Sequence, residues 1–378
     1  MADGHAGFFI SSWLALYNLR AFRARLNVLL LRTLLVSFLL CGWASAQATS
    51  VVFLNPGYTN ERFWVDYSRY MDDAADDLGM QLEVLYGQRD ASNILRQARS
   101  VLERKQPADY LIFTNEMYTG PEILRLFEGS GTRLFSLHST LTPEQQSLVG
   151  GTRGKYHNWI GSLVPNDEEA GYLMASALFK LAPDGGELLA FSGVKNTPSA
   201  SLREAGLQRA LAEHPQIRLR QLLYGEWKYQ RAYEQALGIL PRYPEVKLVW
   251  STNDEMAFGV MQAAKEQGRQ LHYTALNNSK EALQARISGK ADVLALGHFL
   301  LGGCAMVMLY DHAQGRDFAE RGGKDQMARL LRLVDRQQAL RLQGRLARAD
   351  VGLDFGQFSA TRHSELHHYN CSIDSLLR

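Results

Sequence analysis

The chain has 378 residues, of which 46% are hydrophobic and 21% charged, and its formal net charge is +2 with histidine neutral. This length and apolar content are enough for two ordinary α/β domains. A charge so close to zero argues against nucleic acid or an anionic membrane as a partner.

The N-terminal residues 1–46 have the pattern of an export signal. Arginines precede an apolar run at 33–40, and small residues occupy 44–46, where a signal peptidase reads the chain. The apolar run is much shorter than the roughly 20 residues of a membrane span. We therefore predict cleavage before Gln47 and a periplasmic location. A lipid anchor at Cys41 and a translation start downstream of the first methionine stay open.

From residue 50 onward, short apolar runs alternate with amphipathic helical patterns. In the stretch 63–79, for example, apolar residues recur at near-helical spacing until Gly79 ends the pattern. A strand followed by a helix, repeated many times, indicates parallel sheets with crossover helices. The predicted strands are 50–55, 82–87, 109–114, 133–138, 158–163, 187–193, 218–225, 247–252, 272–277 and 292–297.

The two halves of the chain share a pattern. DYLIFTNEMYTGPEILRLF (109–127) and KLVWSTNDEMAFGVMQAA (247–264) each join an apolar strand to Thr-Asn, an acidic residue and a helix. Ligands of α/β proteins bind at the carboxyl ends of parallel strands. Two such strand ends would therefore face each other across a cleft between similar lobes.

We predict an α/β fold with two Rossmann-like lobes of parallel strands and flanking helices. The N-terminal lobe would be discontinuous, and a charged, helix-prone insert in its second part would lie on the surface. The chain would cross between the lobes near 157–165, near 290–298 and again after residue 340. The predicted ranges are 47–160 with 293–378 for the N-terminal lobe, 161–292 for the C-terminal lobe and about 317–350 for the insert.

The run WSTNDEM places Asn253 and Asp254 directly after a predicted buried strand. Both residues would lie at the mouth of the cleft. Asn or Asp at a strand-to-helix junction is also an ordinary helix N-cap, because its side chain accepts a hydrogen bond from a free backbone N–H. Taken alone, this stretch favours the cap.

The chain lacks the sequence motifs of phosphate cradles, dinucleotide-binding turns, zinc proteases and serine hydrolases. We therefore predict no enzymatic activity and no cofactor. His363 and His367 are four residues apart, but no third metal ligand lies nearby in the sequence, so we favour a solvated turn. For Cys304 and Cys371 two alternatives stay open, a disulfide or two separate buried thiols.

Aromatic and polar side chains follow many of the predicted strands, where a cleft would lie. Aromatic faces suit the C–H faces of sugars, and the arginine fork suits hydroxyl pairs or a carboxylate. The alternatives are helix packing for Phe63, an ordinary surface position for Arg203, and a cap on the lobe core for Trp227. The further residues of this kind are Tyr58, Trp64, His138, Ser139, Asn277 and His298.

Five stretches resemble the type I periplasmic binding proteins, the group of ribose-binding and galactose-binding proteins that serve ABC transporters. They occur in the family's order over most of the chain. The resemblance implies two lobes joined by a three-segment hinge, with one ligand held between them. The stretches are GSLVPNDEEAGYLMASAL (161–178), SASLREAGLQRAL (199–211), EWKYQRAYEQ (226–235), STNDEMAFGVMQAA (251–264) and LNNSKEALQARISGKADVLAL (276–296).

This resemblance also implies roles for single residues. Asn253 would point into the cleft, Phe63 and Trp64 would sandwich a sugar ring, and Arg203 would bind its oxygens in front of Trp227. The sequence departs from the sugar-binding pattern at three places. Asn277 stands for a frequent Asp, the pair His138-Ser139 stands for Asp-Arg, and Gly297 stands for a frequent Gln.

A weaker similarity concerns the autoinducer-2 receptor, which works through a membrane sensor kinase. FWV (63–65), DYLIFTNEM (109–117) and LHSTLTP (137–143) carry it. It implies hydrogen-bonding positions for Glu116 and His138, and we add the neighbouring Asn115 to the candidate ligand-binding residues.

We predict a monomeric periplasmic solute-binding protein that closes on a small polar, carbohydrate-like ligand by hinge motion and delivers it to an ABC permease. The alternative is a ligand receptor that signals through a membrane histidine kinase, cyclase or chemoreceptor. No metal and no nucleic acid is expected. The candidate ligand-binding residues are Tyr58, Phe63, Trp64, Asn115, Glu116, His138, Ser139, Arg203, Trp227, Asn253, Asp254, Asn277 and His298.

Overall fold

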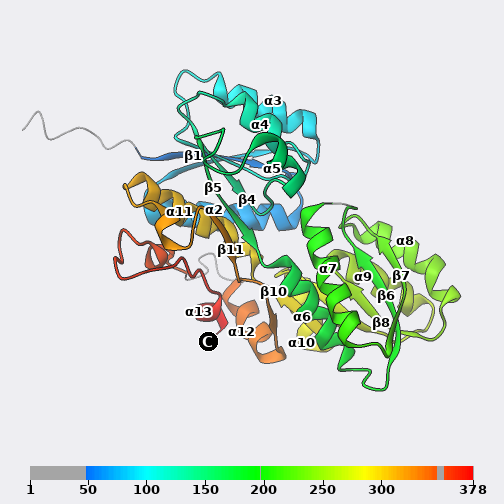
Figure 1. Ribbon diagram of the computed structural model, residues 1–378. Helices are drawn as coiled ribbons and strands as arrows, with labels where there is room; N and C mark the ends of the chain where they lie inside the picture. Colours follow the sequence, from blue (N-terminus) through cyan, green and yellow to red (C-terminus); the bar gives the residue numbers. More distant parts are fainter. Residues whose placement is uncertain (1–47, 196, 347–352, 378) are drawn as a thin grey trace, which may run out of the picture. The chain divides into compact units, whose positions relative to one another are not determined.

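The computed structural model describes residues 48–195, 197–346 and 353–377, and the chain from Thr49 onward forms one compact unit. This unit contains two β-sheets with helices on both faces of each (Figure 1). The predicted signal segment and its cleavage site lie outside the described residues. Within those residues, no helix combines the length and the apolar character that a membrane crossing requires.

The first sheet is parallel throughout, with the strand order β11-β5-β4-β3-β1-β2. Alternate side chains of β1 point to opposite faces, so that Val51 and Phe53 pack with α2 and α11, while Val52 and Leu54 pack with α3 and α4. The strands are β1 (Ser50–Asn55), β2 (Gln81–Tyr86), β3 (Tyr110–Phe113), β4 (Arg133–Leu137), β5 (Trp159–Pro165) and β11 (Asp325–Ala328), and the helices are α2 (Arg62–Leu78), α3 (Ala91–Leu102), α4 (Gly120–Leu126), α5 (Pro143–Val149) and α11 (Leu301–Ala313).

The second sheet repeats this arrangement with the order β12-β10-β9-β8-β6-β7, in which β12 alone runs antiparallel to its neighbour. Leu188 and Ala190 of β6 pack with α6 and α7, and Leu189 and Phe191 pack with α8 and α9. The strands are β6 (Gly186–Ser192), β7 (Ile217–Tyr224), β8 (Val246–Ser251), β9 (His272–Leu276), β10 (Val293–Leu296) and β12 (Arg332–Val334), and the helices are α6 (Asp167–Phe179), α7 (Pro198–Glu213), α8 (Tyr229–Ile239), α9 (Asp254–Glu266) and α10 (Lys280–Ser288).

All ten predicted strands are present, and each begins and ends within two residues of its predicted range. The predicted α/β architecture with two Rossmann-like lobes is confirmed. Gly79 ends α2 in the left-handed conformation, with φ of 67°. Val65, one of the apolar residues of this stretch, is 37% exposed.

The chain passes between the two sheets after β5, after β10, and between β11 and β12. The first two passages lie near their predicted positions. The predicted lobe boundaries at 160/161 and 292/293 fall at the beginning of β5 and β10. Over its whole length, however, β5 belongs to the first sheet and β10 to the second, so the chain changes sheets only after each strand ends. A further passage at residues 329–331, between β11 and β12, was not predicted. After residue 340 the chain changes sides again, near the predicted third passage, because α12 (Arg336–Leu346) packs on α10 of the second sheet and η4 (Phe355–Phe358) packs on α2 and α11 of the first.

The segment 317–350 also differs from the predicted helical surface insert. Its strand β11 extends the first sheet beside β5, and β12 extends the second sheet beside β10. These strands are short, partly exposed edge strands of mixed polarity, so they lack the apolar run that reveals an inner strand. The remaining helices are η1 (Leu240–Arg242), η2 (His298–Leu300), η3 (Phe318–Arg321), α12 (Arg336–Leu346), η4 (Phe355–Phe358) and α13 (Asp374–Leu377).

The C-terminal residues are fastened to α11 at two points. A disulfide joins Cys304 of α11 to Cys371, which settles the alternative that the sequence left open. Further along α11, the buried Asp311 carboxylate accepts hydrogen bonds from the Ser359 hydroxyl at 2.6 Å and from the Tyr369 hydroxyl at 2.9 Å. The histidine-rich run after residue 362 lies in exposed turns beyond the first of these contacts.

Two glycines allow α6 and α7 to approach each other until their backbones touch. A Cβ atom on Gly171 would lie 2.2 Å from the carbonyl oxygen of Arg203, and one on Gly206 would lie 2.1 Å from that of Glu168. These distances are far below van der Waals contact. The close packing matters because it brings Arg203 to the beginning of α6.

We expect Gly171→Ala to lower the free energy of unfolding by about 1–3 kcal/mol, because the added methyl group forces two packed backbones apart. Urea denaturation followed by circular dichroism measures this change. Gly238→Ala in α8 is the matched control, since a Cβ there meets no atom within 4 Å. The control should be neutral or slightly stabilising, and equal stability of both variants would contradict the packing argument.

Removal of the disulfide by Cys304→Ser with Cys371→Ser should destabilise the protein by about 2–4 kcal/mol, because the unfolded chain regains the freedom of a long loop. The melting temperature of the double variant, compared with that of the oxidised protein, measures the loss. Free thiols in the unreduced wild-type protein would show that the bond does not form.

Candidate functional site

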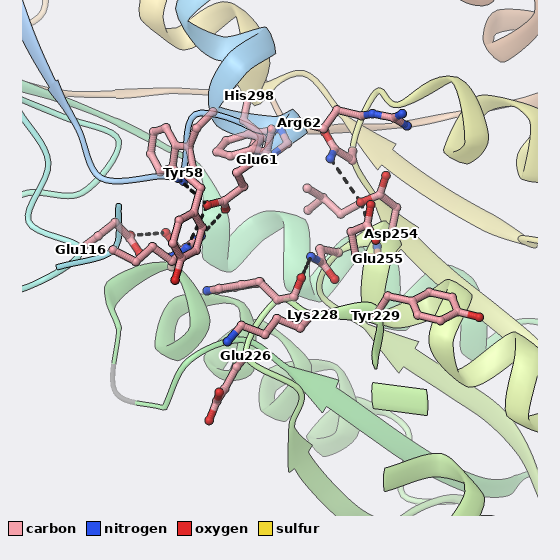
Figure 2. Close-up of a pocket in the computed structure, with 18 of the residues that line it drawn as sticks. Tyr58, Glu61, Arg62, Glu116, Glu226, Lys228, Tyr229, Asp254, Glu255 and His298 are labelled. Atoms are coloured by element: carbon pink, nitrogen blue, oxygen red, sulfur yellow. Dashed lines mark hydrogen bonds and ion pairs between the residues drawn. The ribbon is translucent and has the colours of Figure 1, made fainter. Parts of the chain in front are cut away.

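A cavity of about 680 Å³ lies at the carboxyl ends of strands from both sheets (Figure 2). Its lining comes from loops and helix starts that follow β1 to β4 of the first sheet and β6 to β10 of the second. Eleven of the thirteen predicted residues line it: Tyr58, Phe63, Trp64, Glu116, His138, Arg203, Trp227, Asn253, Asp254, Asn277 and His298.

Asn115 and Ser139 are the two predicted residues outside this lining. The Asn115 amide donates hydrogen bonds to the Thr140 carbonyl at 3.1 Å and to Gln145 Oε1 at 2.7 Å, and its backbone N–H donates to Ser139 Oγ at 3.0 Å. The two side chains thus tie together the loops after β3 and β4. They support the backbone of Glu116 rather than facing the cavity.

Arg203 is the central cation on the second-sheet side. It is buried, and it donates from Nε to Asp167 Oδ1 at 2.7 Å and from Nη1 to the Thr252 carbonyl at 2.9 Å. Its guanidinium carbon lies 5.5 Å from the centre of the Trp227 ring, within cation–π range. Burial raises the pKa of the Asp167 carboxyl, and the charge of Arg203 opposes that rise. The surface position considered for Arg203 is therefore wrong.

Asn253 is the N-cap of α9 and also lines the cavity, so the two interpretations of this residue are compatible. Its Oδ1 accepts a hydrogen bond from Met256 N at 2.9 Å, and its Nδ2 donates to the Trp227 carbonyl at 3.1 Å. The same side chain thereby stabilises the helix start and holds the loop that carries Trp227. Its contact with a ligand stays a prediction.

Asp254 and Asn277 are joined by hydrogen bonds beside Asn253. The buried Asp254 carboxylate accepts from Asn277 Nδ2 at 3.2 Å and from the Ser279 hydroxyl. Burial raises the pKa of Asp254, while these two donors oppose the rise. Most polar groups on this side of the cavity are therefore positioned by the protein itself.

The first-sheet side of the cavity is a cluster of rings. Phe63 stacks on His298, with ring centres 4.7 Å apart, and Trp64 meets Phe63 and His138 edge-on at 4.9 and 5.2 Å. Trp64 is only 2% exposed. Its faces are therefore covered by neighbouring rings, and the implied sandwich of Phe63 and Trp64 around a sugar does not match this arrangement. A ligand has ring faces available at Phe63 and Trp227.

Three ring nitrogens of this cluster are buried without a hydrogen-bond partner among the described residues: Trp64 Nε1, His138 Nδ1 and His298 Nδ1. Such atoms are rare in folded proteins, because a lost hydrogen bond with water goes uncompensated. Burial and the nearby charge of Arg203 lower the pKa of His138 to about 3 and hold that of His298 well below its usual value. Both imidazoles are therefore neutral at neutral pH.

The sequence predictions missed two ion pairs of the lining. Arg89 donates from Nε to Glu61 Oε2 at 3.0 Å, and Arg62 pairs with Glu281 in the first turn of α10, a helix of the second sheet. Arg89 lies shortly after the end of β2. The expectation that polar side chains after strand ends line a cleft would therefore also have identified it. The Arg62–Glu281 pair joins segments 219 residues apart, and no local pattern reveals such a contact.

Glu116 is a buried carboxyl group in the first-sheet lining. It accepts a long hydrogen bond of 3.4 Å from the hydroxyl of Ser199, which lies in the first turn of α7 on the other side of the cavity. Burial raises the pKa of Glu116, and the charge of Arg89 counteracts this. Glu116 is thus a strong acceptor that the protein satisfies only weakly.

Several known proteins are similar to this chain. Residues 161–317 match the periplasmic binding protein domain. A periplasmic sugar-binding protein structure from Pseudomonas fluorescens is 49% identical, with a TM-score of 0.80, and the match covers 87% of this chain and 100% of that one. The D-allose-binding periplasmic protein of Escherichia coli is 25% identical over 62% of this chain and 74% of its own length. A ribose import binding protein of Haemophilus influenzae is 22% identical over 73% and 90%.

The low pKa of His138 predicts how its removal changes stability with pH. Below the unfolded-state pKa of about 6.5, the unfolded chain binds a proton at this residue that the folded protein does not. The free energy of unfolding therefore falls on acidification, until the folded-state pKa of about 3 is reached. His138→Gln removes this contribution, so the variant should gain roughly 2 kcal/mol relative to wild type between pH 7.5 and pH 5.

Urea denaturation at a series of pH values measures this difference. His363→Gln, in an exposed turn, is the matched control and should follow the wild-type curve. Parallel curves for wild type and His138→Gln would show that the imidazole protonates freely in the folded protein.

Proposed function

Since this chain belongs to the type I periplasmic binding proteins, we propose that it is the solute-binding component of an ABC transporter that captures a small polar, carbohydrate-like ligand. The observation that carries this proposal is the cavity between the two sheets. It combines the ring faces of Phe63 and Trp227 with prearranged hydrogen-bonding groups at the ends of opposite strands. The cavity volume suits a small molecule.

The chemistry of the lining supports a polyhydroxy ligand. Apolar C–H faces of a sugar pack on aromatic rings, and its hydroxyl groups need both donors and acceptors. The cavity offers acceptors at Glu116 and Asp254 and donors at Arg203 and Asn253. A site built around hydroxyl groups rejects analogues that lack them, because its own polar groups would then stay unpaired.

The proposal places the mature protein in the periplasm as a monomer, after cleavage of the predicted export signal. Ligand binding would close the two lobes on each other, and the closed form would dock on an inner-membrane permease. Relatives named for allose and ribose binding favour this assignment. The sensor alternative would use the same cavity, and no feature of the site favours it over transport. No step requires catalysis.

A thermal-shift screen tests the proposal first. The mature chain is heated with ribose, allose, other pentoses and hexoses, polyols, nucleosides and amino acids. A ligand at a hundred times its dissociation constant adds about 2.7 kcal/mol to the free energy of unfolding. A rise in melting temperature with sugars or polyols supports the proposal, and a response to amino acids alone contradicts it.

We expect Trp227→Ala and Asn253→Ser to weaken binding of the identified sugar at least tenfold, as measured by titration calorimetry. The first removes a stacking face, and the second keeps an oxygen that caps α9 but removes the amide donor. Leu340→Ala, an exposed truncation on α12 away from the cavity, is the control. If both site variants bind as tightly as wild type and the control, the ligand does not occupy this cavity.

A further inference from the structure

Each of the three arginines that line the cavity already has a carboxylate partner from this chain. Arg203 pairs with the buried Asp167, Arg89 pairs with Glu61 through two nitrogens, and Arg62 pairs with Glu281. The remaining cation of the lining, Lys228, is exposed at the start of α8. An exposed ammonium group is strongly hydrated and screened by salt.

These pairs determine what kind of charge the cavity accepts. Proteins bind carboxylate and phosphate groups chiefly through the donor fork of arginine. Nε and Nη2 of Arg89 and Nε and Nη1 of Arg203 already donate to protein oxygens, so an anionic ligand would meet each guanidinium only together with its carboxylate partner. Withdrawal of Arg203 from the buried Asp167 would leave an uncompensated charge inside the protein, which is strongly unfavourable.

The other charges of the lining act in the same direction. Among the residues that the structure describes, six carboxylates line the cavity against four cations, and Glu116 and Asp254 are buried with no ion-pair partner there. The described donors to these two groups are all uncharged: Ser199 for Glu116, and Asn277, Ser279 and the Glu255 backbone N–H for Asp254. A second negative charge beside them would be repelled in a site of low polarity.

The buried atoms that do lack partners belong to uncharged groups. Within the cavity lining that the structure describes, they are the ring nitrogens of Trp64, His138 and His298 on the first-sheet side. An indole N–H donates, and a neutral imidazole both donates and accepts, so together they match hydroxyl and ether oxygens. None of them supplies the full positive charge that a carboxylate or phosphate seeks.

From this geometry we infer that the ligand is uncharged, and that the cavity excludes carboxylate and phosphate derivatives of the same ligand because its arginines are already neutralised. This inference rests on the proposed function of solute capture. It adds a selection by charge that the family membership does not specify. Arg89–Glu61 is the pair to change in a test, since its side chains are only partly buried, whereas Arg203 and Asp167 are buried.

Matched pairs of neutral and anionic probes test the inference. Titration calorimetry at low salt compares ribose with ribose 5-phosphate, glucose with glucuronate, and galactose with galacturonate, and adenosine serves as an uncharged probe that is not a simple sugar. We expect the neutral member of any pair that binds to bind at least tenfold tighter than its anion. Equal or tighter binding of the anion overturns the inference.

A variant then tests whether the arginine pairing causes the selection. Glu61→Gln keeps an oxygen that can accept from Tyr58 N but removes the negative charge beside Arg89. We expect the ratio of neutral to anionic affinity to fall by about tenfold. Glu122→Gln is the matched control, because it breaks an exposed pair with Arg125 that does not line the cavity. An unchanged ratio in Glu61→Gln contradicts the assignment.

The outcomes separate this inference from the proposed function. Binding of adenosine without any sugar contradicts the carbohydrate proposal and supports an uncharged ligand. Binding of glucuronate or galacturonate without the neutral sugars supports a carbohydrate ligand and contradicts the inference. Silence from all probes contradicts both.

Discussion

The buried ion pair between Arg203 and Asp167 is the interaction on which the second-sheet side of the site depends. Asp167 is the first residue of α6, directly after the chain has left the first sheet, and Arg203 lies in the first half of α7. The pair forms because Gly171 and Gly206 let the two helices touch. Loss of either partner would leave a buried charge, at a cost of about 3–5 kcal/mol. The passage between sheets and the arrangement of the site are therefore linked.

The polar groups on the two sides of the cavity differ in how many of their hydrogen bonds the protein itself supplies. On the second-sheet side, Arg203, Asn253 and Asn277 all hydrogen-bond to neighbouring protein groups. On the first-sheet side, ring nitrogens are buried without partners, and a ring cluster holds them in place. Prearranged donors reduce the ordering that a ligand must impose, and unpartnered atoms reward a ligand that pairs with them. Both properties favour tight binding of a ligand with one particular shape.

The inner strands and most of the cavity lining could be predicted from the sequence, because apolar runs followed by polar or aromatic residues are local patterns. Asn253 is an example, since the run WSTNDEM indicated both its role as a helix N-cap and its position at the end of a strand. The remaining features depend on residues far apart in the chain. The Arg62–Glu281 pair, the enclosed faces of Trp64 and the Cys304–Cys371 bond are of this kind. The edge strands β11 and β12 were missed because three or four residues of mixed polarity give too weak a pattern.

The strand β11 joins the first sheet, and Cys371 is bonded to α11. Both attachments affect the order of folding. During synthesis, β6 to β10 of the second sheet appear as one continuous stretch, and only the short β12 comes later. The first sheet, although it begins the chain, receives its last strand from residues 325–328 and its covalent fastening from residue 371. Contacts between such distant segments form slowly, because a long loop must close first. The first sheet, although its synthesis begins first, is therefore fully fastened only after the C-terminal residues have been made.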